Sequence, residues 1–296
     1  MHFKQKIILF PRSYQVNHYR EHSYAKIIDN PFYSKNGIID NILYNHHVRK
    51  SKRPLIRGSK KWKLLRIYAG LDPSPTLFVF ANFNKQDKLD PNLFSVWMQI
   101  LSSTPGSILW LLEPSNKHSS NENSQRILSE LQIAAAAAGV TSCRILYAPR
   151  VSKEEHIKRS AAADLFLDTF TYGAHSTATD ALMAGLPVLT LTGNSFASRV
   201  GTSILRYSKL GIDKLLVTHS IKDYTDMAIL LAQDECYKGQ KFGLLSWIRN
   251  KLESGIENSD VVDGESYFND FERLSYALID IHYTFDMKKK MHVIIP

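Results

Sequence analysis

The sequence predicts an α/β fold built on a doubly wound, parallel sheet of the Rossmann-like type. Short continuous apolar runs, the pattern of strands buried on both faces, recur along the chain from residue 76 onward. Segments of helical period separate these runs, and polar or Gly-containing turns follow them. Strands that alternate with helices form parallel sheets, which bind ligands at the carboxyl ends of their strands. At 296 residues and 44% hydrophobic content, the chain has enough apolar material for such a core.

Two strands and two helices are predicted in the first half of this sheet. The strands are the apolar runs at 77–81 and 107–112. A helix starts at Asp90-Pro91, because aspartate caps a first turn and proline fits the first helical position. A second helix runs from about Ser124 to Gly139, and we expect its alanine run at 134–138 to pack against the sheet. The first helix has one apolar face: Leu93, Val96, Trp97, Ile100 and Leu101.

The second half repeats the alternation. Further apolar runs predict three strands: 144–147, 165–168 and 188–191. Helices are predicted between and after them: about 153–163, 177–184 and 195–205. A helix–strand–helix stretch then leads to a last helix at 266–283, whose apolar residues share one side: Phe268, Phe271, Leu274, Leu278 and Ile281.

A basic tract between Arg49 and Arg66 accounts for most of the formal net charge of +9. It contains no acidic residue, and the preceding residues 36–47 show little periodicity, which indicates a loop or insertion. A solvated surface segment is the simplest interpretation. Contact with nucleic acid, an acidic partner or a nuclear import receptor is the alternative, because clustered cations attract any polyanion.

Composition restricts the class of protein further. The chain has no run of about 18 apolar residues, and its N-terminus lacks the apolar region of a signal peptide. Cys143 and Cys236 are its two cysteines, without metal-ligand spacing. We therefore expect an intracellular protein, cytoplasmic or nuclear, with no membrane contact.

Residues 167–188 read as a strand end, a Gly-containing turn, a helix and a second strand. The turn carries His175, Ser176 and Thr177 at the start of the helix, where unpaired backbone N–H groups and the helix dipole favour an anion. A phosphate group, as in a nucleotide diphosphate, is the expected ligand. An ordinary capped helix that binds nothing is the alternative from the pattern alone.

This turn resembles the nucleotide-sugar half of the protein O-linked N-acetylglucosamine (O-GlcNAc) transferases and the related SPINDLY proteins. The family typically has His-Thr-Thr, an aspartate three residues later and a Gly-x-Pro turn, matched here by His175-Ser176-Thr177, Asp180 and 185–187. Other blocks follow in the family's order: Asn82-Phe83-Asn84 with Lys88 and Asp90-Pro91, Lys153-Glu154-Glu155-His156 with Arg159, and Ala197-Ser198-Arg199-Val200. The resemblance covers about 200 residues and implies the C-terminal half of a GT-B glycosyltransferase fold.

The resemblance also implies roles for single residues. Lys88 neutralises the leaving diphosphate, and His175 belongs with it to the catalytic group. His156 stacks on the uracil beside Arg159, while Lys153 and Asp180 contact the ribose. The whole set expected to hold the nucleotide sugar is Lys85, Lys88, Val151, Lys153, His156, Arg159, His175, Ser176, Thr177 and Asp180. The donor is UDP-N-acetylglucosamine (UDP-GlcNAc), the acceptors are Ser and Thr hydroxyls of proteins, and no cofactor or metal is expected, since no Asp-x-Asp site occurs.

Departures from the family pattern limit what the resemblance implies. Lys85 and Asp87 stand where the family usually has glutamine and tyrosine. Arg199 is a weaker candidate for binding the nucleotide sugar, because an arginine at a helix start can equally pair with a carboxylate. Complete members carry tetratricopeptide repeats and an N-terminal lobe, which supplies their acid–base candidates, before the matching region. We therefore expect residues 1–75 to be a lead-in strand with a basic insertion or linker, and 76–290 the nucleotide-sugar-binding lobe.

Four alternatives stay open at this point. The chain is the donor half of a transferase whose other lobe is encoded upstream or on another chain, or it is an inactive nucleotide-sugar-binding or interaction module. The SPINDLY branch uses GDP-fucose for protein O-fucosylation, but it generally lacks the Lys-Glu-Glu-His block, so Lys153–His156 and His175 favour UDP-GlcNAc. Related bacterial enzymes that modify adhesins share part of the pattern. The catalytic base is unassigned, and alone the chain is expected to be inactive in transfer.

Overall fold

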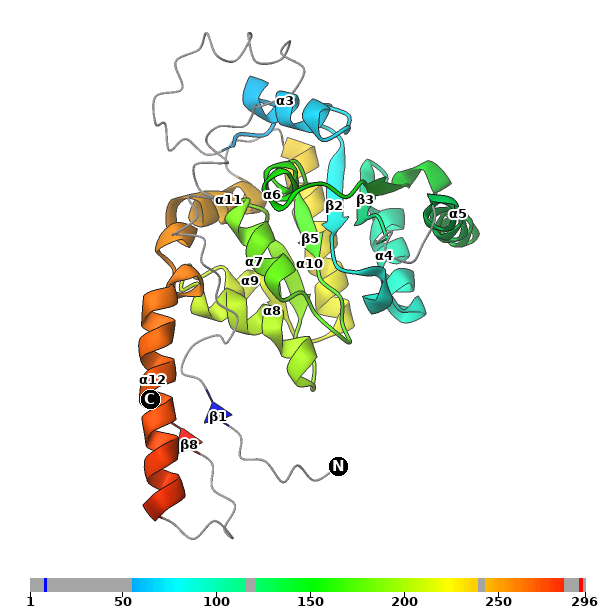
Figure 1. The fold of residues 1–296 in the computed structure, drawn as a ribbon. Coiled ribbons are helices and arrows are strands. Elements are labelled where there is room, and N and C mark those ends of the chain that lie inside the picture. The colour runs from blue at the N-terminus through cyan, green and yellow to red at the C-terminus, as the bar shows by residue number, and fades with distance from the viewer. Residues whose placement is uncertain (1–7, 10–54, 115–120, 239–242, 285–292, 295–296) are drawn as a thin grey trace.

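The sheet is parallel throughout and doubly wound. The computed structural model describes residues 8–9, 55–114, 121–238, 243–284 and 293–294. Six strands of this part form one sheet in the order β4-β3-β2-β5-β6-β7 (Figure 1). Their bounds are β2 (Phe78–Asn82), β3 (Ser107–Leu112), β4 (Ile145–Ala148), β5 (Leu165–Leu167), β6 (Val188–Leu191) and β7 (Val217–Thr218).

The strand order reverses between β2 and β5. The chain builds outward from β2 to β4 and then returns to the other side of β2, so that Phe80 pairs with Leu109 on one flank and Leu165 on the other. All five residues of β2 and all three of β5 are buried, which explains their continuous apolar sequence. A crevice outside the carboxyl ends of β2 and β5 is therefore the expected ligand site.

Helices connect the strands as the sequence predicts. Asp90 caps α4 by accepting a hydrogen bond from the Leu93 backbone N–H at 3.0 Å, and Gly139 follows the end of α5 with a φ of +78°. The helices are α3 (Lys60–Tyr68), α4 (Pro91–Ser103), α5 (Asn121–Ala137), α6 (Lys153–Ser160), α7 (Ser176–Met183), α8 (Phe196–Tyr207), α9 (Asp213–Leu216), α10 (Ile221–Lys238), α11 (Leu244–Gly255) and α12 (Gly264–Thr284).

The alanine run of α5 is not the packing surface that we expected. Only Ala135 in the run at 134–138 is buried, and Ile133 is 70% exposed. The helix also begins at Asn121 rather than near Ser124. Alanine is the best helix former, so the run stabilises α5 through its propensity, while Leu128 and Leu131 pack against the core.

The described end of the basic tract is not a solvated loop. Residues 60–68 form α3, capped by Ser59, whose side chain accepts a hydrogen bond from the Trp62 backbone N–H. Arg57 and Arg66 turn inward and bind the buried carboxylate of Asp164, each at 2.6 Å. These two cations are neutralised internally and are not part of a polyanion-binding surface, whereas residues 49–54 lie outside the described residues.

Asp164 lies at the amino end of β5 and joins distant segments. Besides Arg57 and Arg66, it faces Arg249 of α11 at 3.8 Å and accepts a hydrogen bond from the Val79 backbone N–H of β2 at 2.7 Å. Burial by itself raises the pKa of Asp164, but the three arginines together hold that pKa below its usual value. The carboxylate therefore ties α3 and α11 to the sheet.

The C-terminal helix α12 extends along the side of the molecule (orange to red in Figure 1). Leu274 is 3% exposed, whereas Phe268 and Phe271 on the predicted apolar side are 62% and 50% exposed. β1 (Ile8–Leu9) pairs in parallel with β8 (Val293–Ile294) as a separate two-stranded sheet. The rest of the predicted lead-in strand lies outside the described residues. No helix in the described ranges combines the length and apolarity needed to cross a membrane.

The Asp164 cluster predicts a large effect on stability. Asp164→Asn leaves Arg57, Arg66 and Arg249 without a counter-charge and should lower the free energy of unfolding by about 3–5 kcal/mol in urea denaturation at pH 7. Because the pKa of Asp164 is lowered in the folded state, wild-type stability from this carboxylate is present above about pH 4 and is lost as the pH falls further. Glu130→Gln, in the exposed Arg126–Glu130 pair, is the control and should leave the midpoint unchanged. A loss below about 1 kcal/mol for Asp164→Asn would contradict this account.

Candidate functional site at the carboxyl ends of β2 and β5

The turn after β2 places Lys88 against the loop that follows β5. Lys88 ends the short 3-10 turn Gln86–Lys88, and its Nζ donates a hydrogen bond to the Gly173 carbonyl at 2.8 Å. The same ammonium lies 4.0 Å from the centre of the Tyr172 ring, at cation–π distance. Burial lowers the pKa of Lys88, an effect that Asp168 and Asp87 partly oppose. Lys88 is thus a half-buried cation fixed at the crevice, as a diphosphate-binding lysine requires.

His175 stands at the start of α7, two residues after the carbonyl that holds Lys88. It is the N-cap residue, but its side chain makes no capping hydrogen bond, and its Nε2 lies 3.4 Å from the Ala197 carbonyl. Ser176 is exposed and Thr177 half-buried in the first turn. The first backbone N–H groups of a helix lack carbonyl partners within it, so this N-terminus suits an anion. Burial lowers the pKa of His175, so that the neutral ring is favoured.

Helix α6 carries a second pair of predicted residues. Ser152 and Glu155 form a reciprocal capping box at its start, which explains why a helix begins here. His156 and Arg159 face the same way, as their spacing predicts, with Arg159 Nη2 3.0 Å from His156 Nδ1. Arg159 also donates to the Pro149 carbonyl, and the Phe83 ring meets the His156 ring edge-on at 4.9 Å. The residues expected to hold the base are therefore pre-positioned by one another.

Burial controls the protonation of His156. Burial, together with the positive charges of Arg159, Arg150 and Lys153, lowers the pKa of the imidazole to about 4. The ring is neutral at pH 7. A neutral, flat imidazole is suited to stacking on a nucleobase.

Lys153 and Asp180 connect α6 with α7. Lys153 Nζ lies 3.5 Å from Asp180 Oδ1. Burial raises the pKa of Asp180 to about 7 despite this neighbour, because the lysine is 46% exposed and water screens its charge. The two residues expected at the ribose thus face each other across the gap between the helices.

Three other predicted residues at the same edge of the sheet are exposed to solvent. Lys85, which precedes the turn at Lys88, and Val151, which precedes α6, are both exposed. Arg199 is exposed in the first turn of α8. Among the described residues there is no grouping of three or more His, Cys, Asp or Glu side chains that could hold a metal ion.

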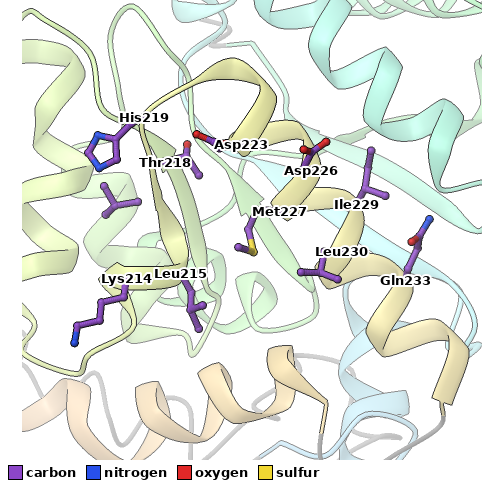
Figure 2. A pocket seen from close by; sticks show the side chains of 11 residues that line it. Lys214, Leu215, Thr218, His219, Asp223, Asp226, Met227, Ile229, Leu230 and Gln233 are labelled. Atoms are coloured by element: carbon purple, nitrogen blue, oxygen red, sulfur yellow. The ribbon is translucent and has the colours of Figure 1, made fainter.

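A separate hollow of about 630 Å³ lies on another part of the lobe (Figure 2). It is bordered by α9, β7 and α10 and includes Leu215, Thr218, Met227 and Leu230, with Asp223 beside them. None of the predicted site residues lines it. Because β7 is the strand farthest from β2 on that side of the sheet, the hollow is remote from the switch point, and we do not assign the donor to it.

Sequence reasoning missed the buried residues behind the site. Asp168, directly after β5, accepts hydrogen bonds from the backbone N–H groups of Thr169 and Ala174, while Asn84 approaches the same oxygen. Tyr172, which covers Lys88, was also missed. An aspartate immediately after a fully apolar strand is a signal for Asp168, but the closure of the loop around it depends on tertiary contacts.

The strand order and the residues at the switch point define the class of protein: a Rossmann-type α/β lobe that gathers a lysine, a histidine and a helix N-terminus at the carboxyl ends of β2 and β5. Residues 68–271 match the family model Glycosyl transferase family 41, and the chain belongs to that family. The glycosyltransferase fold expected from the sequence, the C-terminal half of a GT-B enzyme, is thereby confirmed.

Individual relatives agree with this assignment. A UDP-N-acetylglucosamine–peptide N-acetylglucosaminyltransferase of Caenorhabditis elegans is 34% identical over 196 residues, which is 66% of this chain and 15% of that protein. A probable enzyme of the same description named SPINDLY, from Hordeum vulgare, is 29% identical over 68% of this chain and 20% of its own length. A solved structure of a mutant O-GlcNAc transferase from Thermobaculum terrenum superposes with a TM-score of 0.60 at 25% identity, over 69% of this chain and 36% of that one. The chain thus spans about a sixth to a third of the proteins it resembles.

The protonation of His156 predicts a pH dependence. In an NMR titration of the lobe, the His156 imidazole should titrate near pH 4. The unfolded chain takes up this proton near pH 6.5 and the folded chain does not, so stability should fall as the pH drops from about 6.5 to about 4. His156→Gln should remove this part of the decline and identify the resonance. A titration midpoint near 6.5 in the folded lobe would show that the ring is not buried as described.

Proposed function

We propose that this chain is the donor-binding lobe of an inverting protein O-GlcNAc transferase that uses UDP-GlcNAc without a metal. One observation carries the proposal: the Lys88 ammonium is bound to Gly173 O, two residues before the N-cap of α7. A cation and a helix N-terminus therefore converge where a diphosphate would leave. Transferase names among the relatives support the same donor.

The residues divide between the two ends of the donor. Helix α6 offers His156 and Arg159 to the uracil, and Lys153 of α6 together with Asp180 of α7 faces the ribose. Lys88 and the start of α7 offer positive charge to the diphosphate. In the transfer, the acceptor hydroxyl oxygen bonds to the anomeric carbon of the sugar while the bond from that carbon to the diphosphate oxygen breaks. Negative charge grows on UDP in this step, so fixed positive groups stabilise the transition state more than the ground state.

The acceptor side of the reaction requires more than this lobe. The Ser or Thr hydroxyl must be held in line with the anomeric carbon and shielded from water, which needs a second wall facing the crevice. We assign the second wall and the base that takes the hydroxyl proton to an N-terminal lobe of the kind found in the family. An intracellular site of action, cytoplasmic or nuclear, belongs to the proposal and is supported by the free, exposed thiol of Cys143.

GDP-fucose is the second candidate donor. Several relatives at 29–30% identity carry the name SPINDLY, and the resemblance to that branch implies protein O-fucosylation. The organised His156–Arg159 pair on α6 favours UDP, because it belongs to the block that the fucosyltransferase branch generally lacks.

Donor choice is tested directly by binding. The purified chain, titrated calorimetrically with UDP and with GDP in the presence of EDTA, should bind UDP more tightly, because α6 presents a site for the smaller base and Lys88 replaces a metal at the diphosphate. Arg159→Ala should weaken UDP binding, whereas Arg126→Ala, on the exposed face of α5, should not. Equal or tighter binding of GDP would move the assignment to the fucosyltransferase branch, and a metal requirement would exclude the role given to Lys88.

Lys88→Ala tests the electrostatic part of the mechanism. In an enzyme that joins this lobe to an N-terminal lobe of the family, the variant should lower kcat by a factor on the order of 10² to 10³, because a positioned charge on the leaving group is lost. Lys222→Ala, on the surface of α10, is the matched lysine control and should keep full turnover. Unchanged turnover in Lys88→Ala would mean that the diphosphate binds elsewhere.

A further inference from the structure

We propose that Asp168 is a positioning residue of the donor site. Its buried carboxylate closes the loop 169–174 and thereby fixes the positions of the Gly173 carbonyl, Lys88 and the start of α7 relative to one another. This inference rests on the proposed function, since it concerns how the same crevice is built. Asp168 itself touches neither donor nor acceptor. It acts through the backbone of the loop that does.

One oxygen of Asp168 binds both ends of this loop. Oδ1 accepts hydrogen bonds from the Thr169 N–H at 2.8 Å and from the Ala174 N–H at 2.6 Å. Hydrogen bonds to a carboxylate are stronger than those between neutral groups, so this oxygen pins the loop where it starts and where it ends. The carbonyl of Gly173, immediately before the second of these bonds, is the acceptor for Lys88 Nζ. The position of Lys88 therefore depends on Asp168 through two hydrogen bonds.

The other carboxylate oxygen, Oδ2, lies beside a threonine and two glycines, which leave room for it. Oδ2 accepts a hydrogen bond from Thr190 Oγ1 of β6 at 2.8 Å. A Cβ atom at Gly201 would come within 2.7 Å of Oδ2, which is closer than the two atoms can approach, and one at Gly173 would come within a tight 3.1 Å, so glycine at both positions leaves room for the carboxylate. Gly201 follows the family block at 197–200, and Asn84, which approaches Oδ1 at 3.4 Å, belongs to the block after β2. The carboxylate thus lies between the block after β2 and the segment that follows the block at 197–200.

The charge environment separates Asp168 from its counterpart at the other end of β5. Asp164 has three arginines, whereas in the described part of the chain no ion pair reaches Asp168. A buried carboxylate that lacks an ion-paired cation costs stability. Hydrogen bonds from the loop to Asp168 offset part of this loss of stability. The same hydrogen bonds organise the loop.

The experiment compares two ligands in the isolated lobe. UDP engages the loop and Lys88 through its diphosphate, whereas uridine engages only α6 and α7. Asp168→Ala should weaken UDP binding on the order of 10- to 100-fold by calorimetry, because a misplaced loop displaces Lys88. Uridine binding, followed by ligand-observed NMR, should stay within about twofold of wild type. A general loss of folding would lower both affinities together.

Two further variants separate positioning from stability. Asp168→Asn keeps an oxygen for the two loop N–H groups and can donate its amide to Thr190, so it should restore UDP binding to within about threefold of wild type. Thr190→Val removes the hydrogen bond to Oδ2 but not those to the loop. It should lower Tm and leave UDP binding unchanged. Where Asp168→Ala does not fold, Gly173→Ala should show the same selective loss of UDP affinity by displacing the loop from Oδ2.

The outcomes distinguish this inference from the proposed function. If the wild-type lobe does not bind UDP, the proposed function itself is overturned, because the lobe then has no donor site. A wild-type lobe that binds UDP, with a folded Asp168→Ala variant of equal affinity, would overturn the positioning role alone. Equal losses of UDP and uridine, or an Asp168→Asn variant as weak as Asp168→Ala, would also overturn it.

Discussion

Two buried carboxylates at the two ends of one strand organise this lobe. β5 is three residues long and fully buried, with Asp164 before it and Asp168 after it. At the amino end, Asp164 binds Arg57, Arg66 and Arg249, and so attaches α3 and α11 to the sheet. Charge neutralisation makes that cluster a structural junction, because the attraction between the buried carboxylate and the three arginines offsets the cost of burying their charges.

At the carboxyl end of β5, a second aspartate, Asp168, is held by hydrogen bonds and, among the described residues, not by ion pairs. Asp168 is surrounded by backbone N–H groups and hydroxyls, and the Tyr224 hydroxyl of α10 donates a hydrogen bond to its backbone carbonyl at 3.0 Å. Burial raises the pKa of Asp168, and its hydrogen bonds oppose that rise. The strand thus has a stable, ion-paired end and a hydrogen-bonded end that shapes a loop. Asp168, a buried carboxylate that lowers the stability of the fold because no described residue forms an ion pair with it, therefore lies at the edge where parallel sheets bind ligands.

The side chains at the carboxyl ends of β2 and β5 hold one another in place. His156 is adjacent to Arg159, Lys153 faces Asp180, and Lys88 rests on Gly173 O. Preorganised polar groups need little rearrangement when charge develops on a leaving group, which is the main source of electrostatic catalysis. Membership of glycosyl transferase family 41 fits this arrangement, since diphosphate departure is the step that such a site would assist.

The sequence by itself determined the strands, most helix limits and the local pairs, because apolar runs, caps and i,i+3 spacing depend on neighbours in the chain. It predicted β3 (Ser107–Leu112) residue for residue and the alignment of His156 with Arg159. It was wrong about the alanine run at 134–138 and about Arg57 and Arg66, whereas Lys60, Lys61 and Lys63 of the same basic tract are exposed, as a solvated surface predicts. Only the tertiary structure decided those points, and the role of Asp168, because burial and charge pairing arise from segments about 100 residues apart, such as Arg66 and Asp164.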